Sequence, residues 1–184
     1  MNRKYNRLNE DYRVLHSLCR FFLENTGSSH QVGDHTMLPF LVDMASLFEL
    51  FVAKWLQAHP VEGLQTRAQE RMLIGENEDL EFRIDLLLTD SEKGNVVAVV
   101  DTKYKVPDSP STEDVSQVLA YAEAKSCVEA VLVYPISLKK PLDTRIGKIR
   151  VRTLAFRLDG DLDTNGLSFV RDLLSKRAPA SSLS

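Results

Sequence analysis

The chain has few cysteines, no long apolar run and no excess of basic residues. Its two cysteines, Cys19 and Cys127, form no CxxC or CxxH spacing and lie in apolar contexts, so we predict buried free thiols in a reducing compartment. No apolar run approaches the roughly 20 residues that a membrane span needs. The N-terminal segment MNRKYNRLNEDYR is too polar for a signal peptide. We therefore expect a soluble, cytoplasmic protein with no membrane segment.

The formal net charge of −3 weighs against a free-standing, tight DNA binder, which usually carries a basic balance. The charge is unevenly distributed, however. Residues 76–85 are acidic, whereas the segment 139–157 has one acid, Asp143, and many basic residues: Lys139, Lys140, Arg145, Lys148, Arg150, Arg152 and Arg157. A basic flank beside an acidic pocket would suit a metal site that binds phosphate. Solvated charges at strand ends explain the pattern equally well.

Apolar periodicity predicts the order of helices and strands. The 184 residues of the chain are enough for one compact domain. The expected elements are a helix over 8–23, a polar loop over 25–36, a helix over 38–57, a strand over 80–86, a polar turn over 89–95, a strand from 96 into 101–105, a helix over 112–125, strands over 130–134 and 149–156, and a helix over 166–176. This order predicts an α/β sandwich around a mixed sheet. Residues 1–36 are expected to pack on the core as a helix and polar loop, and 178–184 to form a disordered tail.

Three charged residues lie where two neighbouring strands leave the predicted core. Asp101 and Lys103 follow the apolar run 96–100 and are two residues apart, so both side chains leave the same face of a strand. Asp85 lies on the preceding strand, and if the two strands pair, Asp85 and Asp101 converge within reach of one ion. Two carboxylates, completed by waters and a substrate phosphate, suit Mg²⁺. The alternative is a surface Asp–Lys pair at a strand end, which is common and contributes little.

The segments RIDLLL (83–88) and VVAVVDTKYK (96–105) resemble the core of the PD-(D/E)xK nuclease superfamily. Within it, the chain is similar to the McrC family, the nuclease subunits of modification-dependent restriction systems. LFELFV at 47–52, QVLAYA at 117–122 and VLVYP at 131–135 extend the likeness, which covers roughly 38–156. The resemblance implies a restriction-endonuclease-like three-layer sandwich, with a mixed central sheet flanked by helices and a nuclease domain over 37–177.

The resemblance also implies a role for each matching residue. Asp85 and Asp101 match the two metal-binding acids, Lys103 matches the catalytic lysine, and the carbonyl of Thr102 is a further candidate metal ligand. Ile84 stands where the superfamily often has proline, which takes no part in the chemistry. McrC proteins carry an N-terminal region that meets a GTP-driven AAA+ motor. We see no counterpart of it in this sequence, which puts dependence on such a motor in doubt.

Four further residues are candidates for supporting roles. Glu49 falls in the apolar stripe of the helix over 38–57, where a carboxylate needs a cation. That cation is either the metal or Arg83. Gln117 and Tyr121 are spaced i and i+4 on a face apart from the core stripe and resemble the QxxxY motif of RecB-like nucleases, which helps to hold DNA; surface packing is the alternative. Lys105 shares the face of Asp101 and Lys103 and either contacts a phosphate or is solvated.

These features predict a Mg²⁺-dependent DNA endonuclease, a McrC-like restriction or defence nuclease subunit in which Mn²⁺ substitutes for Mg²⁺. The expected partners are DNA, a McrB-like AAA+ motor or another recognition subunit, and a second copy of the chain, because double-strand cutting with one site per chain calls for two sites. The alternatives are a RecB-like exonuclease, a transposase-type nuclease subunit, and an inactive nuclease fold that binds DNA or assembles with partners.

Overall fold

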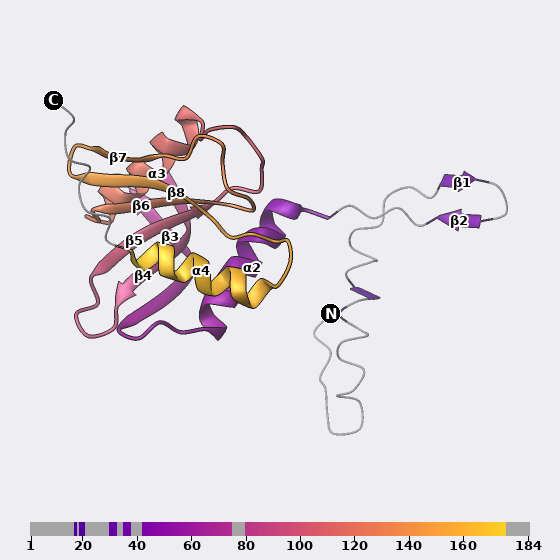
Figure 1. Cartoon of the computed structure of the whole chain (residues 1–184), viewed down its shortest axis with the longest axis horizontal. Helices are drawn as coiled ribbons and strands as arrows, with labels where there is room; N and C mark the ends of the chain where they lie inside the picture. The colour runs from indigo at the N-terminus through magenta and orange to yellow at the C-terminus, as the bar shows by residue number, and fades with distance from the viewer. Residues whose placement is uncertain are drawn as a thin grey trace, which may run out of the picture. The chain divides into compact units, whose positions relative to one another are not determined.

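The computed structural model describes residues 17, 19–20, 30–32, 35–37, 42–74 and 80–175, and it divides the chain into two units, Met1–Asp43 and Met44–Ser184 (Figure 1). In the first unit, Ser17, Cys19 and Arg20 are helical, while the rest of the helix predicted over 8–23 lies outside the described residues. Cys19 is exposed, so the prediction that both thiols are buried was wrong for it and confirmed for Cys127. The tail over 178–184 also lies outside the described residues. None of the described helices has the length and apolar character needed to cross a membrane.

The polar loop predicted over 25–36 contains a β-hairpin instead. Strands β1 (His30–Val32) and β2 (His35–Met37) pair antiparallel, with His30 opposite Met37 and Val32 opposite His35. In the sequence, the dipeptide between these strands is Gly33-Asp34, a pair whose composition is typical of two-residue hairpin turns. That signal was present in the sequence, but the abundance of polar residues around it favoured a loop.

The second unit is built on a six-stranded mixed sheet in the order β3-β4-β5-β6-β8-β7. The strands are β3 (Leu64–Ile74), β4 (Leu80–Asp90), β5 (Val96–Thr102), β6 (Glu129–Tyr134), β7 (Asp143–Ile146) and β8 (Ile149–Ala155). β3, β4 and β5 are successively antiparallel, β5, β6 and β8 are parallel to one another, and β7 pairs antiparallel with β8. The predicted hairpin between β4 and β5 is confirmed, and Gly94 adopts the positive φ of 70° that its turn requires.

Helices cover the sheet on both faces, which gives three layers (Figure 1). On one face, α2 (Met44–Ala58) and α4 (Leu162–Leu174) pack with Leu86, Val100 and Val131. On the other face, α3 (Thr112–Ala124) packs with Val99, Leu132 and other strand residues. The alternation of side chains along β5 sends Val100 to the first face and Val99 to the second. The sequence-based expectation of an α/β sandwich around a mixed sheet is thereby confirmed.

The main departures from the predicted elements are two edge strands and two helix starts. β3 and β7 lie at the two edges of the sheet and were not predicted. The half-buried face of β3 carries the polar Thr66 and Glu70, which hide its alternation, and every residue of β7 is exposed. α4 begins at Leu162 rather than Gly166, after Asp161 caps it by accepting a hydrogen bond from the Thr164 amide at 2.7 Å. Gly166 lies inside the helix, where an added Cβ would come within 2.2 Å of the Trp55 ring. α2 begins at Met44, since Val42 and Asp43 are not helical.

Candidate active site

Asp101 lies on β5 at the point where this strand leaves the core. Its partner across the parallel ladder is Leu132 of β6, and the side chain follows Val99 on the face that α3 covers. The residue is only 1% exposed. A polar group this deeply buried needs partners, and its surroundings therefore decide what it can do.

Asp85 reaches the end of β5 through an interruption in the neighbouring strand. In the β3–β4 ladder, Ala68 pairs with Leu86 and Glu70 with Ile84, while Asp85 and Gln69 between them are left out of the pairing. Gln69 has the left-handed φ of 55°. The Asp85 carboxylate accepts hydrogen bonds from the amide and the hydroxyl of Thr102, both at 2.8 Å. The last β4–β5 pair at this end of the ladder is Leu86 with Val100. Beyond it, the hydrogen bonds between the Asp85 side chain and Thr102 take the place of backbone pairing and hold Asp85 beside the end of β5.

Lys103 connects Asp101 to helix α3. Its ammonium lies 2.6 Å from Oδ2 of Asp101 and donates to Oε1 of Gln117 at 2.9 Å. Gln117 in turn donates from Nε2 to the Tyr121 hydroxyl at 2.7 Å. The structure therefore brings together the predicted Asp101, Lys103 and Gln117–Tyr121 pair. Tyr121, however, does not lie apart from the core stripe as predicted: it is 6% exposed and its ring packs on Phe82, because β4 extends under the helix.

The surroundings of Asp101 make its protonated form more favourable than it is in a free aspartate. Burial raises its pKa to about 6, and the nearby carboxylates of Asp85 and Asp114 add to this, while Lys103 opposes it. The pKa of Lys103 is also raised: burial lowers it, but the attraction of Asp101, Asp114 and Asp85 outweighs that effect. The carboxylates of Asp85, Asp101 and Asp114 therefore lie close enough to repel one another, and the charge of Lys103 does not fully offset this repulsion and the burial of Asp101.

Asp114 is a further acid of this site that the sequence did not single out. It is 6% exposed in the first turn of α3, with its carboxylate 2.6 Å from the Lys105 ammonium and 3.3 Å from the Tyr134 hydroxyl, which donates to it. Its backbone amide donates to the hydroxyl of Ser111, which caps the helix. Burial raises its pKa, but the hydrogen bonds of its carboxylate with the side chains of Lys105 and Ser111, together with the charges of Lys105 and Lys103, outweigh burial and lower the pKa overall. An acid in the first turn of a helix normally indicates only a favourable helix dipole, so its burial was not evident.

Glu49 takes the alternative partner that its sequence position suggested. Oε1 lies 3.4 Å from Nη2 of Arg83 and accepts from Nε2 of Gln69 at 3.2 Å. This polar group spans α2, β3 and β4 next to the interruption that orients Asp85. A role for Glu49 as a metal ligand stays a prediction.

The donor set at this edge can be compared with the needs of a divalent cation. Oδ2 of Asp101 is buried and, among the described residues, has no partner other than the Lys103 ammonium. No group of three or more His, Cys, Asp or Glu side chains in the described part of the chain is arranged to hold a metal. Mg²⁺ retains several waters and is commonly held by one or two carboxylates together with substrate phosphates. Asp85 and Asp101 fit this sparse requirement, and a buried oxygen short of hydrogen bonds is free to take a ligand.

A family model described as McrBC 5-methylcytosine restriction system component matches residues 1–135. The match begins ahead of the stretch that carried the sequence resemblance and includes every candidate site residue from Glu49 to Tyr121. A search of curated proteins returned no match.

Proposed function

Because the chain belongs to the family of McrBC 5-methylcytosine restriction system components, we propose that it is the DNA-cleaving subunit of such a system, a Mg²⁺-dependent endonuclease with a PD-(D/E)xK site. The observation that carries the proposal is the meeting of Asp101 and Lys103, at 2.6 Å, beside Asp85 at the end of β5. A buried, under-bonded carboxylate next to a second acid and a lysine is costly for stability and useful for chemistry on a phosphate.

Each residue of the set has a distinct task in the proposed reaction. Asp85 and Asp101, with the Thr102 carbonyl, would hold the cation, and Mn²⁺ would substitute for Mg²⁺. The bound metal would supply a water made more acidic and charge to offset that of the phosphorus oxygens. Thr102 keeps Asp85 turned toward β5 through its two hydrogen bonds.

Lys103 would orient the attacking water or stabilise the charge that develops on the phosphate. Gln117 and Tyr121 restrict where its ammonium can go, since the Lys103–Gln117–Tyr121 chain is continuous. Held by Asp101 and Gln117, the ammonium lies beside the carboxylates that would hold the metal. Recognition of a DNA site and recruitment by a motor subunit would come from other members of the restriction system.

Cleavage of supercoiled plasmid, with and without 5-methylcytosine, tests the proposal in Mg²⁺, Mn²⁺ and chelator. We expect metal-dependent nicking or linearisation by the wild type, lost at least about 100-fold in Asp101→Asn and Lys103→Ala. Two matched controls, Asp159→Asn and Lys148→Ala, change the same residue types at exposed positions and should keep wild-type activity. Cleavage that survives both site substitutions, or a wild type inert with both metals, would contradict the assignment.

Metal binding can be measured apart from cleavage. Addition of Mg²⁺ or Mn²⁺ should raise the melting temperature of the wild type, because a ligand that binds only the folded state stabilises it. Asp101→Asn should abolish the rise and Asp159→Asn should keep it. DNA binding without any metal-induced rise would favour the inactive-fold alternative.

The Gln117–Tyr121 pair favours a second candidate, a RecB-like exonuclease, because its side chains are hydrogen-bonded to each other and to the site lysine. The same plasmid assay separates the two. An exonuclease degrades linear DNA and leaves closed circles intact, whereas the proposed endonuclease cuts both.

A further inference from the structure

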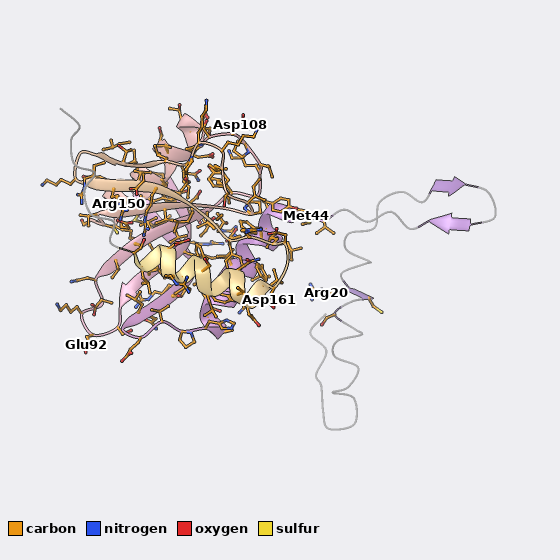
Figure 2. The ribbon with its side chains drawn as sticks, in the orientation of Figure 1. Arg20, Met44, Glu92, Asp108, Arg150 and Asp161 are labelled. Atoms are coloured by element: carbon orange, nitrogen blue, oxygen red, sulfur yellow. The ribbon has the colours of Figure 1, made fainter. Side chains whose placement is uncertain are left out.

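The basic run over 139–157 is divided by the fold between two ends of the sheet. β5, β6 and β8 are parallel, so the residues that follow them leave the sheet at one edge, the edge of Asp101 and Lys103. Lys139, Lys140 and Arg157 follow β6 and β8 and lie at this edge. Arg145 and Lys148 flank the β7–β8 turn, which precedes β8 and lies at the opposite end. Figure 2 labels Asp108, on the loop that follows β5, and Arg150, at the start of β8, well apart on the domain. The basic residues of 139–157 therefore do not form the single basic flank that their closeness in the sequence suggested.

Most cations at the site edge already have an acidic partner. Lys103 pairs with Asp101 and Lys105 with Asp114, each at 2.6 Å. The remaining pairs are Lys139 with Asp108 at 2.9 Å and Arg157 with Asp159 at 2.6 Å. On the loops that follow β5, β6 and β8, all of which the structure describes, Lys140 is the one cation for which no acidic partner is found.

The backbone of Lys140 is hydrogen-bonded to the loop that follows β5, which also carries Lys103. Its amide donates to the carbonyl of Asp108 at 2.8 Å, and the neighbouring Lys139 ammonium binds the Asp108 carboxylate. Asp108 lies five residues after Lys103, on the loop that leaves β5. Residue 108 thus joins the loops that follow β5 and β6, and it fixes the backbone of Lys140, whose side chain is exposed, at the same end of the sheet as Lys103.

We propose that Lys140 binds a backbone phosphate of the DNA substrate and is the charged anchor of the substrate beside Asp101 and Lys103. The inference deepens the proposed nuclease function and rests on it for the identity of the ligand. An ammonium with no acidic neighbour gains most from a phosphate, because no existing ion pair has to be broken. Such a contact releases a counterion and contributes affinity without regard to base sequence.

Lys148 provides a matched control. It follows Gly147 in the β7–β8 turn, is exposed like Lys140, and also has no acidic partner among the described residues. Removing either side chain changes the net charge of the chain by the same amount. A purely nonspecific effect of charge would therefore be equal in the two variants, while an effect of position would not.

The test measures binding of a short fluorescein-labelled DNA duplex by anisotropy over a range of salt concentrations, in chelator so that nothing is cut. We expect Lys140→Ala to lower the salt dependence, the slope of log K against log salt, by about 0.9. At about 0.1 M salt this slope corresponds to roughly eightfold weaker binding. Lys148→Ala should bind like the wild type. As a second measurement, DNA should protect Lys140 but not Lys148 from acetylation, read by mass spectrometry of the unaltered protein.

Equal effects of the two variants, an unchanged salt slope in Lys140→Ala, or no DNA binding by the wild type at low salt would each overturn the inference. These outcomes are separable from failure of the nuclease proposal. If plasmid is cleaved but Lys140 and Lys148 behave alike, only the anchor is wrong. If Lys140 alone is required for binding but no metal supports cleavage, the anchor stands and the nuclease assignment is wrong.

Discussion

Arg152 and Asp101 are both almost inaccessible, at 4% and 1% exposed, but the regions around them differ. Arg152 lies on β8 under helix α4, where its guanidinium donates to the carboxylate of Glu129 and to the carbonyls of Asp172 and Leu173 in the last turn of the helix. The Asp172 carbonyl also accepts from the amide and the hydroxyl of Ser175, which caps the helix. The arginine adds to these bonds, supplies a donor to the Leu173 carbonyl and is itself satisfied. Asp101, at the carboxyl end of β5, has a carboxylate oxygen with only Lys103 beside it.

The difference separates a buried charge whose hydrogen bonds are complete from one that retains capacity for a ligand. A buried ion whose hydrogen bonds are complete stabilises one arrangement and has nothing left to offer a ligand. A buried ion short of partners destabilises the free protein, but it retains the capacity to bind a cation or a substrate. Substitutions at the two positions should therefore have effects of opposite sign on stability.

The largest effect is expected from Arg152→Ala. Removing the buried guanidinium leaves the half-buried Glu129 with only Arg150, at 3.7 Å, and the Leu173 carbonyl without its donor, which should lower the free energy of unfolding by about 3–5 kcal/mol. Urea denaturation followed by circular dichroism measures the change. An Arg152→Ala variant as stable as the wild type would contradict the view that this cluster is structural.

Asp101→Asn should instead stabilise the metal-free protein at neutral pH. Because the pKa in the folded state is raised to about 6 from 3.8, the stabilising contribution of protonated Asp101 is complete below pH 3.8 and is lost as the pH rises through 6. The variant does not titrate, so its stability relative to the wild type should grow between pH 4 and pH 7, by something on the order of 3 kcal/mol. Denaturation in chelator at both pH values measures the difference. A relative stability that does not change with pH would show that Asp101 is not short of partners.

Asp114→Asn tests a satisfied carboxylate within the site region. Its pKa is lowered, so its contribution to stability is present above the unfolded value near 3.8 and is lost as the pH falls through the lower folded value. The variant should be less stable than the wild type at pH 7 by about 1.5 kcal/mol, because hydrogen bonds to a charged group are weakened. The deficit should shrink on acidification, opposite in pH trend to Asp101→Asn. A stabilised variant would place Asp114 with Asp101 rather than with Arg152.

The smallest effect is expected from Arg157→Ala. This arginine pairs with Asp159 at 2.6 Å, but both side chains are more than half exposed. Exposed pairs contribute little because solvent screens them. Thermal melting should not distinguish the variant from the wild type, and a clear loss of stability would mean that exposure does not separate the two kinds of arginine.

The core of the site was predictable because it depends on local spacing. Asp101 and Lys103 are two residues apart, so their side chains leave the same face of β5, and the 2.6 Å ion pair between them agrees. The short turn between β4 and β5 brings Asp85 to the same end of the sheet. The pair of Gln117 and Tyr121 was likewise visible as an i, i+4 spacing. What the spacing did not predict is that Tyr121 is buried, since this depends on where Phe82 of β4 lies.

Asp114 and the division of the basic run were not predictable in the same way. The environment of Asp114 is made by Lys105 from the β5 loop and Tyr134 from β6, which are neighbours only in the folded sheet. The edge strand β7 was not predicted, because all of its residues are exposed. Without β7, nothing in the sequence indicated that the chain reverses direction there and carries Lys148 to the end of the sheet opposite the site.

The sequence by itself determined the order of most elements, the residues at the centre of the site and the resemblance to a restriction nuclease, because each of these follows from neighbours along the chain. Only the tertiary structure decided which charges are satisfied. Arg152, Asp101, Asp114 and Lys140 are all charged residues in the sequence, and whether each is fully paired depends on which side chains other strands, helices and loops bring near it. Burial and hydrogen bonding depend on those distant partners, so the fold alone separates the structural charges from those available to a ligand.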